Sequence, residues 1–164
     1  MKLLCIDPGT EVSGVVVIDT VTGELSGVEP AIDNNELIRS FPFKHKQICD
    51  HMAIEMIASY GMPVGVSTFE TVVWIGRFMQ EFGVDRCTKI YRKDVKIELC
   101  GSHKAKDGNI RQAILDRYPT VGGGKTPQVG TKSQPGPLYG MAKHAWSALA
   151  VGLTWQSQTA ATAA

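Results

Sequence analysis

An acidic side chain ends the first apolar segment of this sequence, Leu3–Asp7, and Pro8 and Gly9 follow it. A strand that ends in aspartate before a glycine-containing turn directs a carboxylate away from the sheet edge and leaves room for a phosphate. Carboxylate oxygen is a ligand that hard cations such as Mg²⁺ prefer. The pattern therefore indicates a cation site at Asp7, although an ordinary hairpin with Asp-Pro-Gly at its turn would look the same.

Basic side chains form a second candidate group, between residues 89 and 111. They fall on two predicted helices and on the turn between them. Such side chains hold phosphate groups and position a nucleic acid without reading its sequence, although a basic helix face can also be merely solvated. The members of this group are Lys89, Arg92, Lys93, Lys96, Lys104, Lys106 and Arg111.

The charge of the chain is unevenly distributed, although its net charge is only +1. Residues 1–85 contain 5 Lys and Arg against 12 Asp and Glu, whereas residues 86–164 contain 12 against 4. No acidic residue follows Asp116. The asymmetry favours an acidic, cation-binding part joined to a phosphate-facing part, unless the two halves intermix in the fold and average out.

The composition is that of an ordinary globular protein, with 43% hydrophobic and 20% charged residues in 164. No apolar run approaches the roughly 20 residues that a membrane-spanning helix needs, and Asp7 interrupts the N-terminus before a signal peptide could form. We therefore expect a cytoplasmic protein with no membrane partner. The four cysteines are widely spaced and predict neither a zinc site nor a disulfide framework.

Three short apolar segments at the start of the chain, Leu3–Asp7, Gly14–Asp19 and Leu25–Val28, are separated by turn-forming residues. They predict an antiparallel meander. Next, apolar residues recur at every fourth position between His45 and Tyr60 and predict a helix.

A second acid, Glu70, follows the predicted strand Val64–Phe69, so that a carboxylate would end a central strand. The remaining elements complete a mixed sheet covered by helices, an α/β fold. They are a helix over Thr71–Phe82, a strand over Thr88–Tyr91, helices over Asp94–Cys100, Asp107–Tyr118 and Met141–Trp155, and a mobile loop over 120–137. We expect one domain over residues 1–155 and a flexible tail over 156–164.

The stretch Asp7-Pro-Gly-Thr-x-x-Ser-Gly resembles the first motif of the RuvC-type Holliday junction resolvases of the RNase H-like superfamily. It resembles the actin-like ATPases less specifically. Phe69-Glu70 resembles the second acidic position of the RuvC family, residues 94–111 its basic substrate-facing region, and 144–153 its last helix. These stretches occur in the family's order across residues 1–153, and residues 136–140 resemble its phage-borne branch.

The resemblance implies an RNase H-like fold with a mixed five-stranded sheet whose first three strands are antiparallel. It also implies a structure-selective endonuclease that resolves four-way and other branched DNA during recombination, in a bacterial host's cytosol if a phage encodes it. Two Mg²⁺ ions per site, replaceable by Mn²⁺, would activate water and stabilise the leaving oxygen. A homodimer would supply two sites, and no small-molecule cofactor is expected. The implied metal ligands are Asp7, Glu70 and His144, with Lys96 and Ser147 as further catalytic positions.

Ser147 departs from the family pattern, which places an aspartate there, before Ala-Leu-Ala. His144 stands where some relatives have histidine and others aspartate. Three explanations stay open: a natural variant whose Ser147 holds a metal-bound water, an engineered inactive form, or a binding protein that has lost cleavage.

Family positions that face the DNA backbone near the cleaved bond match Lys96 and, within one residue, Lys106. Trp74 and Phe78 lie four residues apart on one helix face. In relatives an aromatic residue in this region enters the junction centre, whereas burial in the core or in a dimer interface would serve packing.

Two other functions compete with the nuclease. A non-catalytic protein that binds branched DNA would tolerate Ser147. An actin-like phosphotransferase shares the Asp-x-Gly-Thr start, but that fold needs two such domains, which 164 residues cannot hold.

Overall fold

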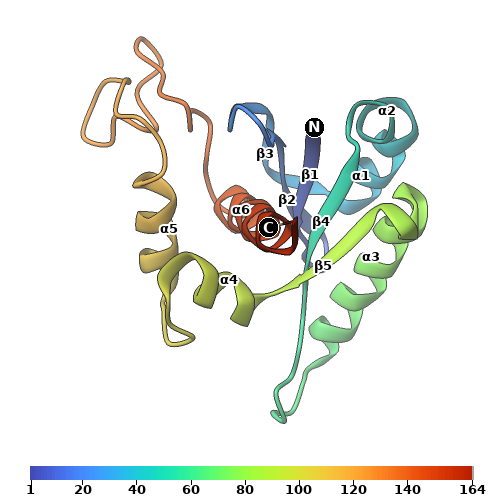
Figure 1. The fold of residues 1–164 in the computed structure, drawn as a ribbon. Helices are drawn as coiled ribbons and strands as arrows, with labels where there is room; N and C mark the ends of the chain where they lie inside the picture. The colour runs from blue at the N-terminus through green and yellow to red at the C-terminus, as the bar shows by residue number, and fades with distance from the viewer. Residues whose placement is uncertain (164) are drawn as a thin grey trace.

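A five-stranded sheet forms the centre of the computed structural model, which describes residues 1–163 (Figure 1). The strand order is β3-β2-β1-β4-β5. β1 pairs antiparallel with β2, and β2 with β3, whereas β4 runs parallel to both β1 and β5. The strands are β1 (Lys2–Asp7), β2 (Val12–Asp19), β3 (Leu25–Asp33), β4 (His51–Met56) and β5 (Cys87–Tyr91). The expected mixed sheet with three antiparallel strands is confirmed.

Helices cover both faces of the sheet (Figure 1). On one face lie α1 (Asn34–Ser40), the π-helical turn Phe41–His45, α2 (Lys46–Ile48) and α3 (Val66–Phe82). On the other lie α4 (Arg92–Cys100), α5 (Asp107–Leu115) and α6 (Ala145–Ala163). A 3₁₀ turn, Val84–Arg86, leads from α3 into β5. None of these helices is both long and apolar enough to cross a membrane.

The alternation of side chains along β1 explains the two cores. Leu3 and Cys5 pack beneath α6, while Leu4 and Ile6 pack beneath α1 and α3. Both sets are fully buried because successive side chains of a strand point to opposite faces. Asp7 is next in the first set and therefore points toward the face that α6 covers.

The helix expected over residues 45–60 is wrong in its second half, because residues 51–56 form β4. Met52, Ala53 and Ile54 are all completely buried between β1 and β5. A strand buried on both faces shows no alternation, and a short apolar run of this kind cannot be distinguished from a helix by periodicity.

The strand expected over residues 64–69 is also wrong, because α3 begins at Val66. Val66 and Phe69 are exposed rather than buried, at 73% and 61%. Glu70 therefore lies in the second turn of a helix instead of at the end of a strand.

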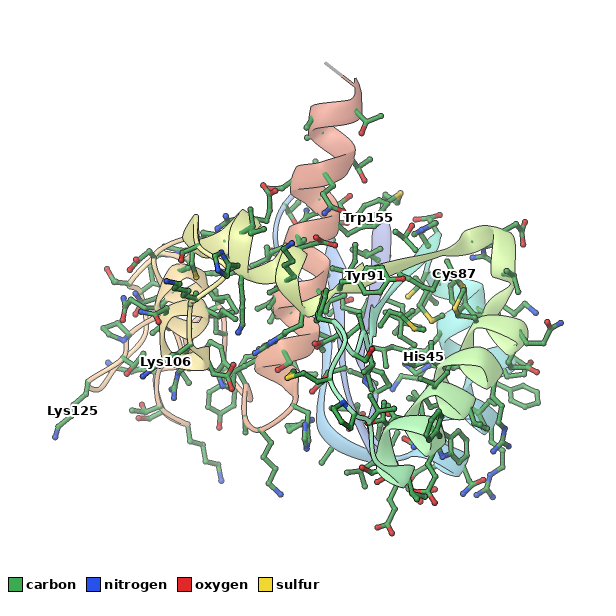
Figure 2. All side chains as sticks on the ribbon, turned by 90° about the horizontal axis from the view of Figure 1, so that it is seen from below. His45, Cys87, Tyr91, Lys106, Lys125 and Trp155 are labelled. Carbon is green, nitrogen blue, oxygen red and sulfur yellow. The ribbon has the colours of Figure 1, made fainter. Side chains whose placement is uncertain are left out.

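The loop expected to be mobile over residues 120–137 is tied together by backbone hydrogen bonds. Gly122 donates to the carbonyl of Pro127, and Gly136 to that of Val129. Lys125 lies at the outer end of this loop and points away from the sheet (Figure 2). In the expected tail, residues 156–163 continue α6, and Ala164 lies outside the described residues.

Candidate functional site

Two carboxylates lie side by side where β1 and β4 end. The parallel register pairs Ile6 with Ile54, so Asp7 and Glu55 follow at adjacent positions. Both point toward the α6 face, because Cys5 and Ala53, two residues earlier on each strand, pack in that core. Their side chains are only 17% and 14% exposed. The register of the two strands therefore builds an acidic pair at one edge of the sheet.

Burial makes ionisation of this pair costly. Burial, and after it the neighbouring Asp7, raise the pKa of Glu55 to about 7, while Arg92 opposes the shift. Burial likewise raises the pKa of Asp7, against the lowering effect of His144. Oε2 of Glu55 is buried without a hydrogen-bond partner. Two close carboxylates with an unpartnered oxygen fit a divalent cation, which would relieve their repulsion.

His144 joins the pair from the residue before α6. Its Nδ1 lies 3.1 Å from Oδ2 of Asp7. Two ligand atoms of one cation lie about this far apart, so Nδ1 without its proton and Oδ2 of Asp7 could bind the same ion. The structure therefore brings together the predicted residues Asp7 and His144.

Gly14 explains why His144 can lie so close to the sheet. It pairs with Asp7 across β1 and β2, and a Cβ atom there would be 2.4 Å from the carbonyl carbon of His144. Only a residue without a side chain permits this approach. Lys143, at φ 44°, turns the chain into α6.

Ser147 lies on the first turn of α6 and lines a cavity of about 340 Å³ together with Arg92, Asp107 and Lys143. The carboxylate in this cavity comes from Asp107, the first residue of α5. Within residues 1–163, no group of three His, Cys, Asp or Glu side chains is already arranged to enclose an ion, so Asp7, Glu55 and His144 would have to draw together around one. The site is therefore acidic but poor in ligands on the Ser147 side.

The sequence predicts Glu70 at the end of a strand, and this position is wrong. It lies on the surface of α3, in a shallow depression with Thr10, Glu11 and Trp74. The sequence analysis did not identify Glu55 as a candidate metal ligand, although Ala53-Ile54-Glu55 repeats the pattern of an apolar strand that ends in an acid. The helical reading of residues 45–60 concealed that signal.

Several basic candidates line a second cavity, of about 360 Å³, beside the acidic pair. Lys93, Lys96 and His103 share it with Arg92 and Tyr60. Arg92 thus borders both cavities. Its Nη1 lies 3.9 Å from Oε2 of Glu55, and its other amino group contacts the carboxylate of Asp107.

The other predicted DNA contacts are more dispersed. Arg111 lies over the ring of Trp146, 4.6 Å from its centroid, and lines the Ser147 cavity. Lys104 borders a shallow depression with Ser102 and Asn109. Lys89 is exposed on β5, and Lys106 caps the start of α5.

The two aromatic candidates on α3 differ in exposure. Phe78 is fully buried and packs against Phe41, with ring centroids 5.7 Å apart. It therefore belongs to the core, which is the packing alternative considered for it. Trp74 is partly exposed beneath the guanidinium of Arg77, 4.0 Å away.

Comparison with solved structures agrees with the strand order and the layers. The Thermus thermophilus RuvC structure superposes with a TM-score of 0.66 at 17% identity, covering 99% of this chain and 97% of that one. T. thermophilus RuvC in complex with a Holliday junction substrate gives 0.64 at 17% identity, over 97% and 94%. No protein-family model matches the sequence, and no curated protein is similar enough in sequence to match. The chain therefore has the RNase H-like fold, in the form seen in RuvC.

Proposed function

We propose that this protein is a metal-dependent endonuclease that cleaves four-way DNA junctions. The observation that carries the proposal is the buried pair Asp7 and Glu55 at the ends of two parallel strands, next to a basic cavity. A neighbour of this fold is a RuvC protein in complex with a Holliday junction substrate. A carboxylate pair beside phosphate-binding side chains suits hydrolysis of a phosphodiester.

Each residue has a distinct task in this proposal. Asp7, Glu55 and His144 would hold Mg²⁺, for which Mn²⁺ can substitute. The bound cation supplies activation of water and neutralises phosphate charge. Lys93 and Lys96 bind backbone phosphates of the DNA and position the scissile strand.

Lys96 also serves the reaction itself. It lines the cavity that Arg92 borders, one helical turn further along α4. An ammonium group there stabilises negative charge that develops on the phosphate. Glu70, as an exposed acid beside Thr10, would influence DNA approach rather than hold the ion.

Two nearly opposed nicks in a junction require two sites, which a homodimer with twofold symmetry supplies. Branched DNA would be recognised by its shape rather than its base sequence. The residues 136–140 support a phage-borne resolvase that acts in the cytosol of a bacterial host.

Cleavage of a labelled synthetic four-way junction tests the proposal. We expect nicks with Mg²⁺ or Mn²⁺, and none after chelation. The unsubstituted protein should leave a linear duplex of the same sequence intact. Asp7→Asn should abolish cleavage of the junction and leave junction binding nearly unchanged. Cleavage retained in this variant would place the active site elsewhere.

A second candidate is a non-catalytic protein that binds branched DNA. It is favoured by Ser147, since the α6 side of the site offers no carboxylate. Tight, metal-independent junction binding without nicks, unchanged by Ser147→Asp, would support this function instead.

A further inference from the structure

Arg92 occupies an unusual position between two acids. It is the first residue of α4 and follows β5 directly. The pairing of Met56 with Tyr91 brings this start of the helix beside Glu55. The guanidinium lies 3.9 Å from Glu55 and contacts Asp107. The Arg92 and Glu55 side chains are only 27% and 14% exposed, so bulk water screens their interaction incompletely, whereas Asp107 is 87% exposed.

The helix itself does not explain this arginine. The N-terminus of a helix carries partial positive charge and is stabilised by acidic side chains rather than basic ones. Arg92 and Lys93 nevertheless occupy the first two positions of α4, ahead of the one acid of that turn, Asp94. Because the local preference is violated, the position of Arg92 is better explained by what it contacts than by helix stability.

The ligands around the acidic pair are unequally distributed. Asp7 lies beside Glu55, and Nδ1 of His144 is 3.1 Å from Asp7. Ser147 and Asp107 line the cavity that Arg92 also borders, and the carboxylate of Asp107 is already paired with Arg92. A second divalent ion would therefore find few free oxygen ligands, and the positive charge beside Oε2 of Glu55, which has no hydrogen-bond partner, is that of Arg92.

We propose that the guanidinium of Arg92 takes the place of a second divalent cation, so that each chain binds one metal ion instead of two. The inference rests on the metal site of the proposed function and specifies its composition. Arginine is suited to this task because it stays protonated and carries five donors in a planar fork. Contacts with Glu55 and Asp107 leave donors for a phosphate oxygen in the cavities that Arg92 borders.

Titration of the protein with Mn²⁺, without DNA, tests the stoichiometry. Calorimetry and electron paramagnetic resonance should show one Mn²⁺ per chain and no spin-coupled ion pair. Arg92→Gln should gain a second Mn²⁺, because Glu55 and Asp107 lose their fixed cation. Arg92→Lys should retain one, since it keeps the charge. Two ions in the unsubstituted protein, or one ion in Arg92→Gln, would overturn the inference.

Lys93→Gln is the matched control, since it removes a charge from the same helical turn and the same cavity and should leave the stoichiometry at one. A second ion in Lys93→Gln would show that general loss of positive charge is sufficient and would overturn the specific role of Arg92. Junction cleavage is scored separately. If the protein binds two ions and cleaves junctions, the one-ion inference is rejected and the proposed nuclease function stands. If it binds one ion and does not cleave, the nuclease function is rejected and the one-ion inference stands.

Discussion

Nδ1 of His144 lies 3.1 Å from Oδ2 of Asp7, although the two residues are 137 positions apart in the chain. The contact joins the start of α6 to the end of β1. It requires the bare backbone at Gly14, over which His144 passes. Hence the geometry of the proposed metal site depends on a residue that has no chemistry of its own.

Gly14→Ala should displace His144 from Asp7, because the new Cβ would lie 2.4 Å from the His144 backbone. Loss of an orienting or ligating histidine should weaken Mn²⁺ binding roughly 10–100-fold. Calorimetric titration measures the change. The control is Gly27→Ala, whose Cβ would meet Val17 at an ordinary 3.7 Å. Equal affinity in the two variants would contradict the positioning role of Gly14.

Asp7→Asn should raise the stability of the metal-free protein above pH 7, since it removes one charge from a buried pair that repels itself. We expect an increase on the order of 1–2 kcal/mol in the free energy of unfolding. Urea unfolding in the presence of a chelator measures it. Added Mn²⁺ should stabilise the unsubstituted protein much more than the variant.

Asp19→Asn is the matched control with the opposite sign. Hydrogen bonds from the backbone amides of Val21 and Thr22 lower the pKa of Asp19. The charged form is therefore favoured in the fold, and its removal should destabilise the protein. A rise in stability for both variants would show that charge reduction alone is responsible.

His45 should make the protein sensitive to mild acid. Burial lowers the pKa of this residue to about 4 from its ordinary value of 6.5. Between these values the unfolded chain binds a proton that the folded one does not, so stability falls as the pH falls. The loss should reach up to about 3 kcal/mol near pH 4.

Unfolding measured between pH 7 and pH 4 tests this prediction, with His45→Gln as the comparison. Glutamine can keep a hydrogen bond to Ser40, whose Oγ lies 3.1 Å from Nδ1 of His45. The difference between the two pH profiles should isolate the histidine. Parallel profiles would assign the acid sensitivity to other groups.

Lys96→Ala should weaken junction binding uniformly and lower the salt dependence of log K by about one unit of slope. The reason is that Lys96 lines the basic cavity next to the acidic pair. Fluorescence anisotropy from 50 to 200 mM KCl measures both effects. Lys44→Ala is the control, because Lys44 pairs with Glu29, outside that cavity. A matching loss in this control would make the effect one of net charge.

Phe69→Lys should disrupt the proposed homodimer. Phe69 and Val73 are apolar residues on α3 that are 61% and 62% exposed, and an apolar helix face of this kind favours association with a second copy. Sedimentation equilibrium should show a dimer for the unsubstituted protein and a monomer for the variant. Phe43→Lys, at a residue that is 81% exposed, should leave the dimer intact. A monomeric unsubstituted protein would reject the dimer itself.

Local sequence was sufficient to place Asp7 at the end of a strand and to predict the antiparallel strands, because a strand, its terminal acid and the following turn are adjacent in the chain. The last helix was also predicted, although it begins at Ala145, one residue after His144, rather than at Met141. The fold class also followed, since the order of the elements and the resemblance to RuvC agree, and the superposition with the T. thermophilus RuvC structure bears it out.

Glu55 could not be identified from local sequence. β4 is buried on both faces, so its apolar residues show no alternation and their spacing is equally compatible with a helix. Only the pairing of Ile54 with Ile6 places Glu55 beside Asp7. The acidic pair is thus a product of strand register.

The position of Arg92 was decided in the same way. Its basic side chain suggested a phosphate contact, and nothing in its sequence neighbourhood names Glu55 or Asp107 as partners. Those contacts arise because β5 lies next to β4 and α5 packs beside α4. The sequence alone determines which types of side chain are available. Long-range packing determines which of them meet, because burial and strand pairing depend on residues far apart in the chain.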